Sequence, residues 1–322
     1  MKKFAKVIAF AIVALVLIAV VGIGYITMFL PNVGKPEDVK IAITPERIAR
    51  GEYLANHITL CTDCHSYRDW SKRSRPVDPG KLDAGGILFD EGDNVPGKLY
   101  SPNITPFALK NWSDGQILRA ITTGESQDGH ALFPLMPWQN FSKMDREDLY
   151  AIIAYLRTLH PLQTAPYPAH QLNFPTNIIV HLIPQKASFG KLPPESDTVA
   201  YGGYLVNAAG CIFCHSQSDK GNILPGMEFA GGVSFRIGGK TVISANITPD
   251  KNTGIGNWTQ QVFLARFNEV RDTSGEMYKH ADKYITVMPW YDYAGMKQND
   301  LKSIYAYLHS RVKPVSHKVN TW

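Results

Sequence analysis

The four cysteines of this 322-residue chain form two C-x-x-C pairs, and a histidine directly follows each pair. The two motifs are Cys61-Thr62-Asp63-Cys64-His65 and Cys211-Ile212-Phe213-Cys214-His215. Two cysteines three positions apart on a helical turn can form thioethers to the vinyl groups of a haem, and the adjacent histidine then points its ring at the iron. The spacing therefore predicts two covalently bound haem c groups. The four cysteines would form the thioethers, and His65 and His215 would each bind an iron.

Zinc binding and thiol redox chemistry are the other common uses of a C-x-x-C pair. A zinc site needs four ligands close together, and neither motif has a second C-x-x-C or an H-x-x-x-H at finger spacing. A redox motif of the thioredoxin type needs a βαβ pattern around it, which this sequence lacks. The histidine after both pairs favours haem attachment over these two alternatives.

A haem of this type usually takes a second axial ligand, and the sequence offers a methionine in each half. Met136 follows His65 at nearly the same separation as Met288 follows His215, and Pro-Trp comes directly after each methionine. A methionine ligand raises the reduction potential relative to a second histidine. Two other pairs also recur and stay open as alternatives: Met144 with Met296, and His130 with His280.

The motifs are part of an internal duplication with a period of about 150 residues. Seven landmarks recur in the same order and at a nearly constant offset. They begin at Arg50 and Tyr201, Cys61 and Cys211, Ala84 and Ala230, Asn103 and Asn246, Asn111 and Asn257, Met136 and Met288, and Ala154 and Ala306. A period this long indicates two copies of one domain, each with its own haem site.

The duplication predicts two domains, at 45–165 and 196–322, joined by a Pro-rich linker at 166–195 in which no long helix can run. Apolar spacing and start signals predict a helix before each cysteine pair and another at each domain's end. The predicted helices are Glu46 to about Thr59, Leu149 to Leu159, Thr198 to about Ala208, and Leu301 to His309. Sustained period-two alternation is absent, so the predicted fold class is all-α.

The N-terminal segment, 1–30, has the composition of a membrane segment. Three lysines precede an apolar run from Val7 to Leu30 that contains no charged residue. A membrane-spanning helix needs about 20 apolar residues, which this run exceeds, and a signal-peptide core has only about 7 to 15. We expect an uncleaved anchor at 1–30 and a linker at 31–44, with a cleaved export signal as the alternative. The positive-inside rule then leaves the lysines in the cytoplasm and the haem domains in the periplasm of a bacterium.

Several other repeated residues have candidate roles. Tyr53 with Tyr155, and Tyr204 with Tyr307, are expected to form the contact between first and last helices, where Gly51 and Gly202 allow close approach. Amide or indole N–H groups near a charged carboxylate offset its burial, so four residues are candidate contacts for the haem propionates. These are Asn103, Trp112, Asn246 and Trp258. The alternative is that the asparagines fix loops and the tryptophans fill the core.

Together these motifs resemble the class I cytochrome c domain, and most closely the cytochrome c subunits of membrane-bound alcohol and aldehyde dehydrogenases. The resemblance covers about residues 45 to 316. It implies haems with His/Met ligation and a role in carrying electrons from a dehydrogenase partner towards quinone or a terminal oxidase. The chain departs from that subunit type in having two haem motifs instead of three, and in its N-terminal span.

The sequence therefore favours a dihaem electron carrier, because a haem iron with both axial positions filled exchanges electrons but has no vacancy for a substrate. An enzyme with one open haem, such as a peroxidase or a sulfur-compound oxidoreductase, is the alternative. A haem-based sensor would need an appended signalling domain. The net charge of +5 is modest and shows no clustered basic stretch, so a nucleic-acid partner is not expected.

Overall fold

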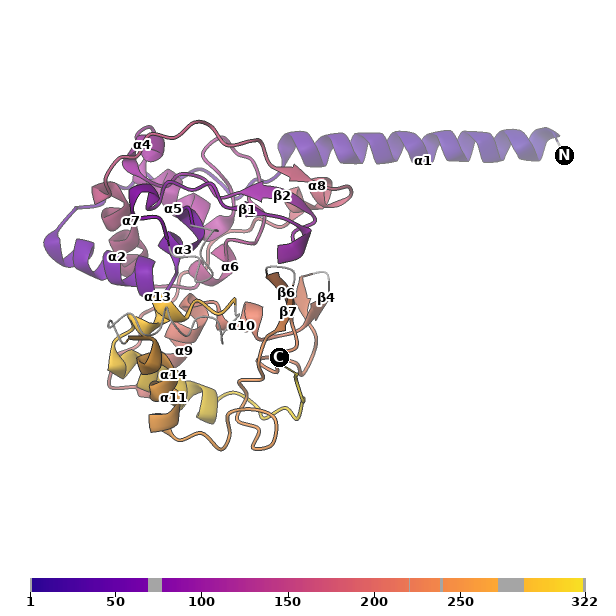
Figure 1. Cartoon of the computed structure of the whole chain (residues 1–322). Helices are drawn as coiled ribbons and strands as arrows, with labels where there is room; N and C mark the ends of the chain where they lie inside the picture. Colours follow the sequence, from indigo (N-terminus) through magenta and orange to yellow (C-terminus); the bar gives the residue numbers. More distant parts are fainter. Residues whose placement is uncertain (1, 69–76, 220, 238–239, 272–286, 321–322) are drawn as a thin grey trace.

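The computed structural model describes residues 2–68, 77–219, 221–237, 240–271 and 287–320. A long N-terminal helix, α1, projects from a two-part body (Figure 1). The helices are α1 Lys2–Phe29, α2 Pro45–His57, α3 Cys61–His65, α4 Pro106–Leu109, α5 Asp114–Thr123, α6 Trp138–Phe141, α7 Arg146–Thr158, α8 Thr176–Ile179, α9 Thr198–Ala208, α10 Cys211–Cys214, α11 Gln260–Arg271, α13 Trp290–Ala294 and α14 Gln298–Ser310. Short 3₁₀ turns cover Pro79–Lys81, Glu91–Asp93 and Val180–Leu182.

Two helix pairs form the centre of the body. Helix α2 packs against α7, and α9 packs against α14, so each sequence repeat has its own first and last helix in contact. The four predicted helices are confirmed. Side-chain caps explain where three of them begin, because Thr44, Asp145 and Asp197 each accept a hydrogen bond from a backbone N–H of the first turn.

Glycine permits the close crossing in both helix pairs. A Cβ added to Gly51 would lie 1.9 Å from the backbone oxygen of Ala151, and one added to Gly202 would lie 1.9 Å from that of Ser303. Real Cβ atoms do not approach backbone oxygen so closely. The expected role of these two glycines is therefore confirmed.

The hydroxyls of Tyr53 and Tyr204 contact the opposite repeat, whereas their expected packing against Tyr155 and Tyr307 stays a prediction. The Tyr53 hydroxyl donates to Asp300 of the other repeat (2.6 Å), and the Tyr204 hydroxyl donates to Asp148 (2.6 Å). Both carboxylates stand at the third position of a last helix, α14 or α7, where the helix dipole favours negative charge. Within the first repeat, Arg50 also pairs with Asp148 at 2.8 Å. The two repeats therefore exchange equivalent hydrogen bonds across their contact.

Short antiparallel strands supplement the helices and depart from a purely α fold. They are β1 Leu88–Phe89, β2 Gly97–Tyr100, β3 Gln171–Leu172, β4 Ser218–Asp219, β5 Asn222–Ile223, β6 Ser234–Ile237 and β7 Lys240–Ile243. The strand orders are β1-β2-β3, β4-β5 and β6-β7. The β6-β7 hairpin had a sequence signal, since a Gly-Gly pair separates two runs that contain aromatic or β-branched residues.

The segments expected as linkers pack against the first repeat. Strand β3 pairs with β2, and the backbone N–H groups of Gln185 and Gly190 donate to Thr123 and Met144. Before α2, the N–H of Ile41 donates to the Asp114 carboxylate at 2.8 Å. The exact domain bounds, 45–165 and 196–322, stay a prediction.

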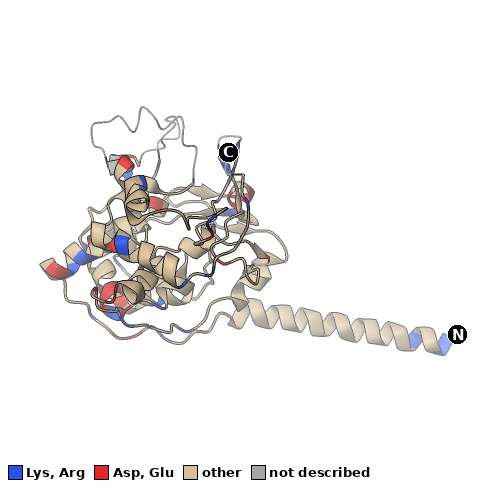
Figure 2. Cartoon of the chain, turned by 90° about the horizontal axis from the view of Figure 1, so that it is seen from below, with Lys and Arg blue, Asp and Glu red and all other residues tan. Residues whose placement is uncertain are grey.

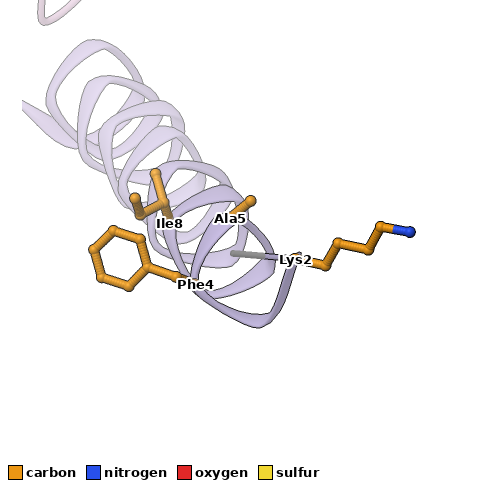
Figure 3. Close-up of a pocket in the computed structure, with 4 residues that line it drawn as sticks. All are labelled: Lys2, Phe4, Ala5 and Ile8. Carbon is orange, nitrogen blue, oxygen red and sulfur yellow. The ribbon is translucent and has the colours of Figure 1, made fainter.

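Helix α1 has no buried residue and carries basic side chains only at its N-terminal end (Figure 2). Its mean hydropathy reaches 3.1 in its most apolar window, so by length and composition it meets the requirements of a membrane span, as a signal sequence also would. At its first turns, an open apolar hollow is lined by Lys2, Phe4, Ala5 and Ile8 (Figure 3).

Replacing Gly202 by Ala should destabilise the protein by about 2 to 3 kcal/mol, because α9 must move away from the Ser303 carbonyl. The gain in helix propensity of about 1 kcal/mol offsets only part of this cost. Gly203→Ala is the matched control, because its new Cβ would meet only the side chain of Tyr307, which can shift. Urea unfolding measures both variants. Equal stability of the two variants would contradict the close-crossing argument.

Candidate haem sites

Each C-x-x-C pair lies in a short helix that follows directly after the first helix of its repeat. The residue before the first cysteine has a left-handed backbone in both cases, Leu60 with φ 56° and Gly210 with φ 65°. This residue turns the chain from α2 into α3 and from α9 into α10. The sulfur atom of Cys61 also lies 3.3 Å from the Thr59 hydroxyl.

A backbone carbonyl holds each motif histidine by the same ring nitrogen. Nδ1 of His65 lies 2.8 Å from the oxygen of Pro102, and Nδ1 of His215 lies 2.7 Å from the oxygen of Ala245. A carbonyl oxygen can only accept, so Nδ1 carries the proton and the lone pair is on Nε2. Burial lowers the pKa of both histidines, against a smaller opposing effect of the carbonyl. Each ring is therefore a neutral imidazole, fixed in the tautomer that binds a metal through Nε2.

The four cysteine thiols are in surroundings that suppress the thiolate. Desolvation by the surrounding protein raises the pKa of Cys61 to about 11 and those of Cys64 and Cys211 to about 12, and it raises the pKa of Cys214. By surface area Cys61 and Cys211 are half-buried, and Cys64 and Cys214 are exposed. Reactive redox cysteines have the opposite property, a lowered thiol pKa. These surroundings suit cysteines that are consumed in thioether bonds.

The two repeated methionine pairs differ in burial. Met144 and Met296 are almost fully buried in the hydrophobic core, where a thioether serves as a packing group. Met136 and Met288 are less buried, and each stands in the loop directly before a short helix, α6 or α13. In each loop the N–H of the following tryptophan donates to the methionine oxygen at 2.8 Å. This difference in burial favours Met136 and Met288 over Met144 and Met296 as candidate axial ligands.

The histidine alternative for the second axial ligand has only one member in the described residues. His130 is exposed, and its ring pairs with the carboxylate of Asp128 in the same loop. A solvent-facing position agrees with the expectation for a histidine in a Gly-rich loop. His280 lies outside the described residues.

The asparagines predicted as propionate contacts have other partners. Asn103 accepts from the N–H and hydroxyl of Thr105, and its Nδ2 donates to the Leu162 oxygen at 2.8 Å and the Thr164 hydroxyl at 3.2 Å. Asn246 has the equivalent contacts, accepting from Thr248 and donating to the Val315 oxygen. These bonds support the loop-fixing alternative. Trp112 and Trp258 are partly buried against the core, and a propionate contact of all four residues stays a prediction.

One buried indole provides a test of whether a haem fits. Trp138 is fully buried, and its Nε1–H has no hydrogen-bond partner among the described residues. An unpartnered buried donor costs about 1 to 3 kcal/mol. A haem propionate is an acceptor of the kind that would satisfy it, and Trp138 closes the same Met-Pro-Trp triplet as Met136. The unpartnered donor is compatible with the group that the motif predicts, and Trp138 is a further candidate contact for it.

The two sites lie near each other where the repeats meet. Besides burial, charges on Cys61, Asp292 and Cys214 raise the pKa of Cys64, so the cysteines of the two motifs are within electrostatic range of each other. Tyr293 of α13 is buried, and charges on cysteines of both motifs add to the effect of burial in raising its pKa. Its hydroxyl donates to the Ala209 oxygen at 2.7 Å. Helices α6 and α13 lie along this contact (Figure 1), with α6 against α9 and α13 against α2.

Comparison with known proteins identifies several relatives. No family model matches the chain. The chain is 34% identical over 236 residues to the fructose dehydrogenase cytochrome subunit of Gluconobacter japonicus, covering 66% of this chain and 43% of the relative. It is 27% identical over 240 residues to the cytochrome c subunit of the quinone-dependent alcohol dehydrogenase of Gluconacetobacter polyoxogenes, covering 68% of this chain and 48% of the relative.

A third relative is covered more completely. The diheme cytochrome c-type protein of Cereibacter sphaeroides is 25% identical over 260 residues, which are 77% of this chain and 80% of the relative. The chain thus spans less than half the length of the two dehydrogenase subunits. It is a relative of the cytochrome c subunits of bacterial alcohol, fructose and gluconate dehydrogenases and of a diheme cytochrome c.

Proposed function

We propose that this chain is an electron-transfer cytochrome with two covalently bound haem c groups. It would be tethered by α1 to the bacterial inner membrane, with both haem-bearing domains in the periplasm. The observation that carries the proposal is the matched pair of histidine–carbonyl bonds, from His65 to Pro102 and from His215 to Ala245. A metal-binding imidazole needs this support for its second nitrogen, and a redox dithiol does not.

The proposed ligand sets are His65 with Met136 and His215 with Met288, in two tandem class I cytochrome c domains. Support for the methionines comes from their less buried position in equivalent loops, while the competing Met144 and Met296 fill the core. When bound, a haem with both axial positions filled supplies a one-electron couple and leaves no position for a substrate. This argues for a carrier and against an open-haem enzyme.

Different residues of the chain would attach and orient the two haem groups. The cysteines attach each group covalently, and the carbonyl-bound histidines present Nε2 without a proton. The nearness of Cys64 and Cys214 favours electron passage between the two sites within one molecule. The relatives that are dehydrogenase subunits indicate the class of donor, a dehydrogenase at or in the membrane. A quinone-linked complex or an oxidase would be the acceptor.

The haem content tests the attachment sites. The purified full chain should contain two haem c per polypeptide by the pyridine haemochrome assay. The double variant Cys61→Ala/Cys64→Ala should contain one, and Cys211→Ala/Cys214→Ala should contain one. Retention of two haems in either double variant would contradict the assignment of that site.

The methionine ligands can be tested by spectroscopy. A methionine sulfur bound to ferric haem gives a weak long-wavelength band, so Met136→Ala and Met288→Ala should each remove about half of it. Met144→Leu and Met296→Leu are matched controls, because leucine keeps the volume of these core side chains. An unchanged band in both ligand variants, or its loss in the controls, would overturn the assignment.

The partner class can be tested in native membranes. Tagged full-length chain, extracted in mild detergent, should co-purify with subunits of a dehydrogenase, and that enzyme's substrate should reduce both haems. An untagged strain serves as the control. Recovery without a dehydrogenase, together with rapid peroxide turnover by the purified chain, would favour the enzyme alternative instead.

A further inference from the structure

One buried backbone position is the same in both repeats but has a different side chain. Asp83 and Phe229 both have a left-handed backbone, with φ of 59° and 61°. The N–H of Asp83 donates to the Ser66 hydroxyl at 2.8 Å, and that of Phe229 donates to Ser216 at 2.9 Å. Their carbonyl oxygens accept from Ile104 and Ile247. Both serines directly follow a motif histidine, so the two positions stand in the same relation to their haem sites.

The carboxylate at this position in the first repeat has no cationic partner among the described residues. Asp83 is 1% exposed, and in that part of the chain only the Thr62 hydroxyl stabilises its charge. Aspartate tolerates a left-handed backbone, but asparagine does so equally, and Phe229 occupies the same conformation in the second repeat. The backbone therefore does not require an acid here. A buried carboxylate without a cationic partner is unfavourable, so its presence calls for a function.

The acidic side chain lies beside the first attachment site. The charge of Asp83 contributes to raising the pKa of Cys61 in α3 and of Tyr155 in α7, in both cases behind the larger effect of burial. Glu52 of α2 is the other acidic group that acts on Tyr155. Burial raises the pKa of Asp83 to about 6, against a smaller lowering effect of the Thr62 hydroxyl, which contacts Asn56.

The second site is apolar at each matched position. Ile212 replaces Thr62, Phe213 replaces Asp63, and Phe229 replaces Asp83. Two other acids act at the first site. Asp63 pairs with Arg68, and Asp292 of α13, which raises the pKa of Cys64, has Arg68 and His57 beside it to offset its charge. No cation among the described residues offsets Asp83, which therefore supplies the uncompensated charge difference between the sites. The two haem sites share their scaffold but differ in their electrostatic environment.

We propose that the Asp83 carboxylate lowers the reduction potential of the first haem site relative to the second, so that electrons pass from the first site to the second. A nearby negative charge stabilises ferric over ferrous iron, and a medium of low dielectric strengthens this effect. Apolar surroundings, as at the second site, disfavour the ferric charge and raise the potential. This inference rests on the proposed function, because it assumes a haem at each motif.

The test is a spectroelectrochemical titration of the full-length, haem-loaded protein in detergent at pH 8. The unmodified protein should show two one-electron steps. In Asp83→Asn the lower potential should rise and the upper potential should stay the same. The rise should change the equilibrium ratio of reduced to oxidised haem at the first site by at least tenfold, which is about 59 mV for a one-electron couple. In Phe229→Asp the upper step should move down. Asp128→Asn, which removes an exposed charge, should move neither.

A second measurement uses the protonation of Asp83. The carboxylate is charged above its pKa and neutral below it, so the difference between the unmodified protein and Asp83→Asn should be present at pH 8 and shrink at pH 5. A haem propionate that titrates is present in both proteins and cancels in this comparison. Cys61, once bound in a thioether, does not titrate.

The outcomes separate this inference from the proposed function. Two haems per chain with steps that do not respond to Asp83→Asn at pH 8 would overturn the role of Asp83 and leave the carrier role intact. Fewer than two haems in the unmodified protein would instead contradict the proposed function. If Asp83→Asn lowers the haem content, the Phe229→Asp variant provides the test instead. An unchanged upper reduction potential in Phe229→Asp would also overturn the inference.

Discussion

Two crossed hydrogen bonds hold the repeats in one body. The hydroxyls of Tyr53 and Tyr204 each donate to a buried carboxylate of the opposite repeat, Asp300 or Asp148. Burial and the facing carboxylate raise the pKa of both tyrosines well above the usual value, so both hydroxyls keep the proton they donate. Each last helix carries a carboxylate at its third position that accepts from the other repeat as well as from its own, where Arg50 and Tyr201 are the donors. The relative position of α3 and α10, and with it the approach of the two sites, depends on this exchange.

Within each repeat, a loop asparagine links the fold to the chemistry. Asn103 accepts from Thr105 and donates to the Leu162 oxygen, and so fixes the loop whose preceding carbonyl, that of Pro102, holds the His65 ring. The same arrangement recurs at Asn246, which follows the Ala245 carbonyl. An asparagine that shapes this loop determines the histidine tautomer without touching the ring. The asparagine recurs in both repeats because each repeat needs the preceding carbonyl oxygen in place to hold its motif histidine.

The sequence predicted local features well and contacts between repeats poorly. The four main helices followed from caps and apolar spacing, and α5 also had a signal, the capping box of Ser113 with Gln116, that was not used. The hydrogen bonds of Tyr53 and Tyr204 to the opposite repeat were not predicted, because in a duplicated chain a residue pair can form within one copy or between the two copies. Sequence spacing does not distinguish these cases. Only the packing of α2 and α9 against the opposite repeat decides between them.

In a duplicated chain, each position of one repeat can be compared with the equivalent position of the other. This comparison distinguishes residues that the fold requires from residues that serve a function. Where the two repeats have the same residue, as at Gly51 with Gly202 and at Ser66 with Ser216, the backbone of both repeats requires that residue. Where they differ at an identical backbone position, as at Asp83, geometry cannot be the cause. A buried charge on one side of such a pair costs stability without improving the fold, so the difference is best sought in what the two copies do differently. In a chain with two equivalent attachment motifs, that difference is the ease with which each site holds an electron.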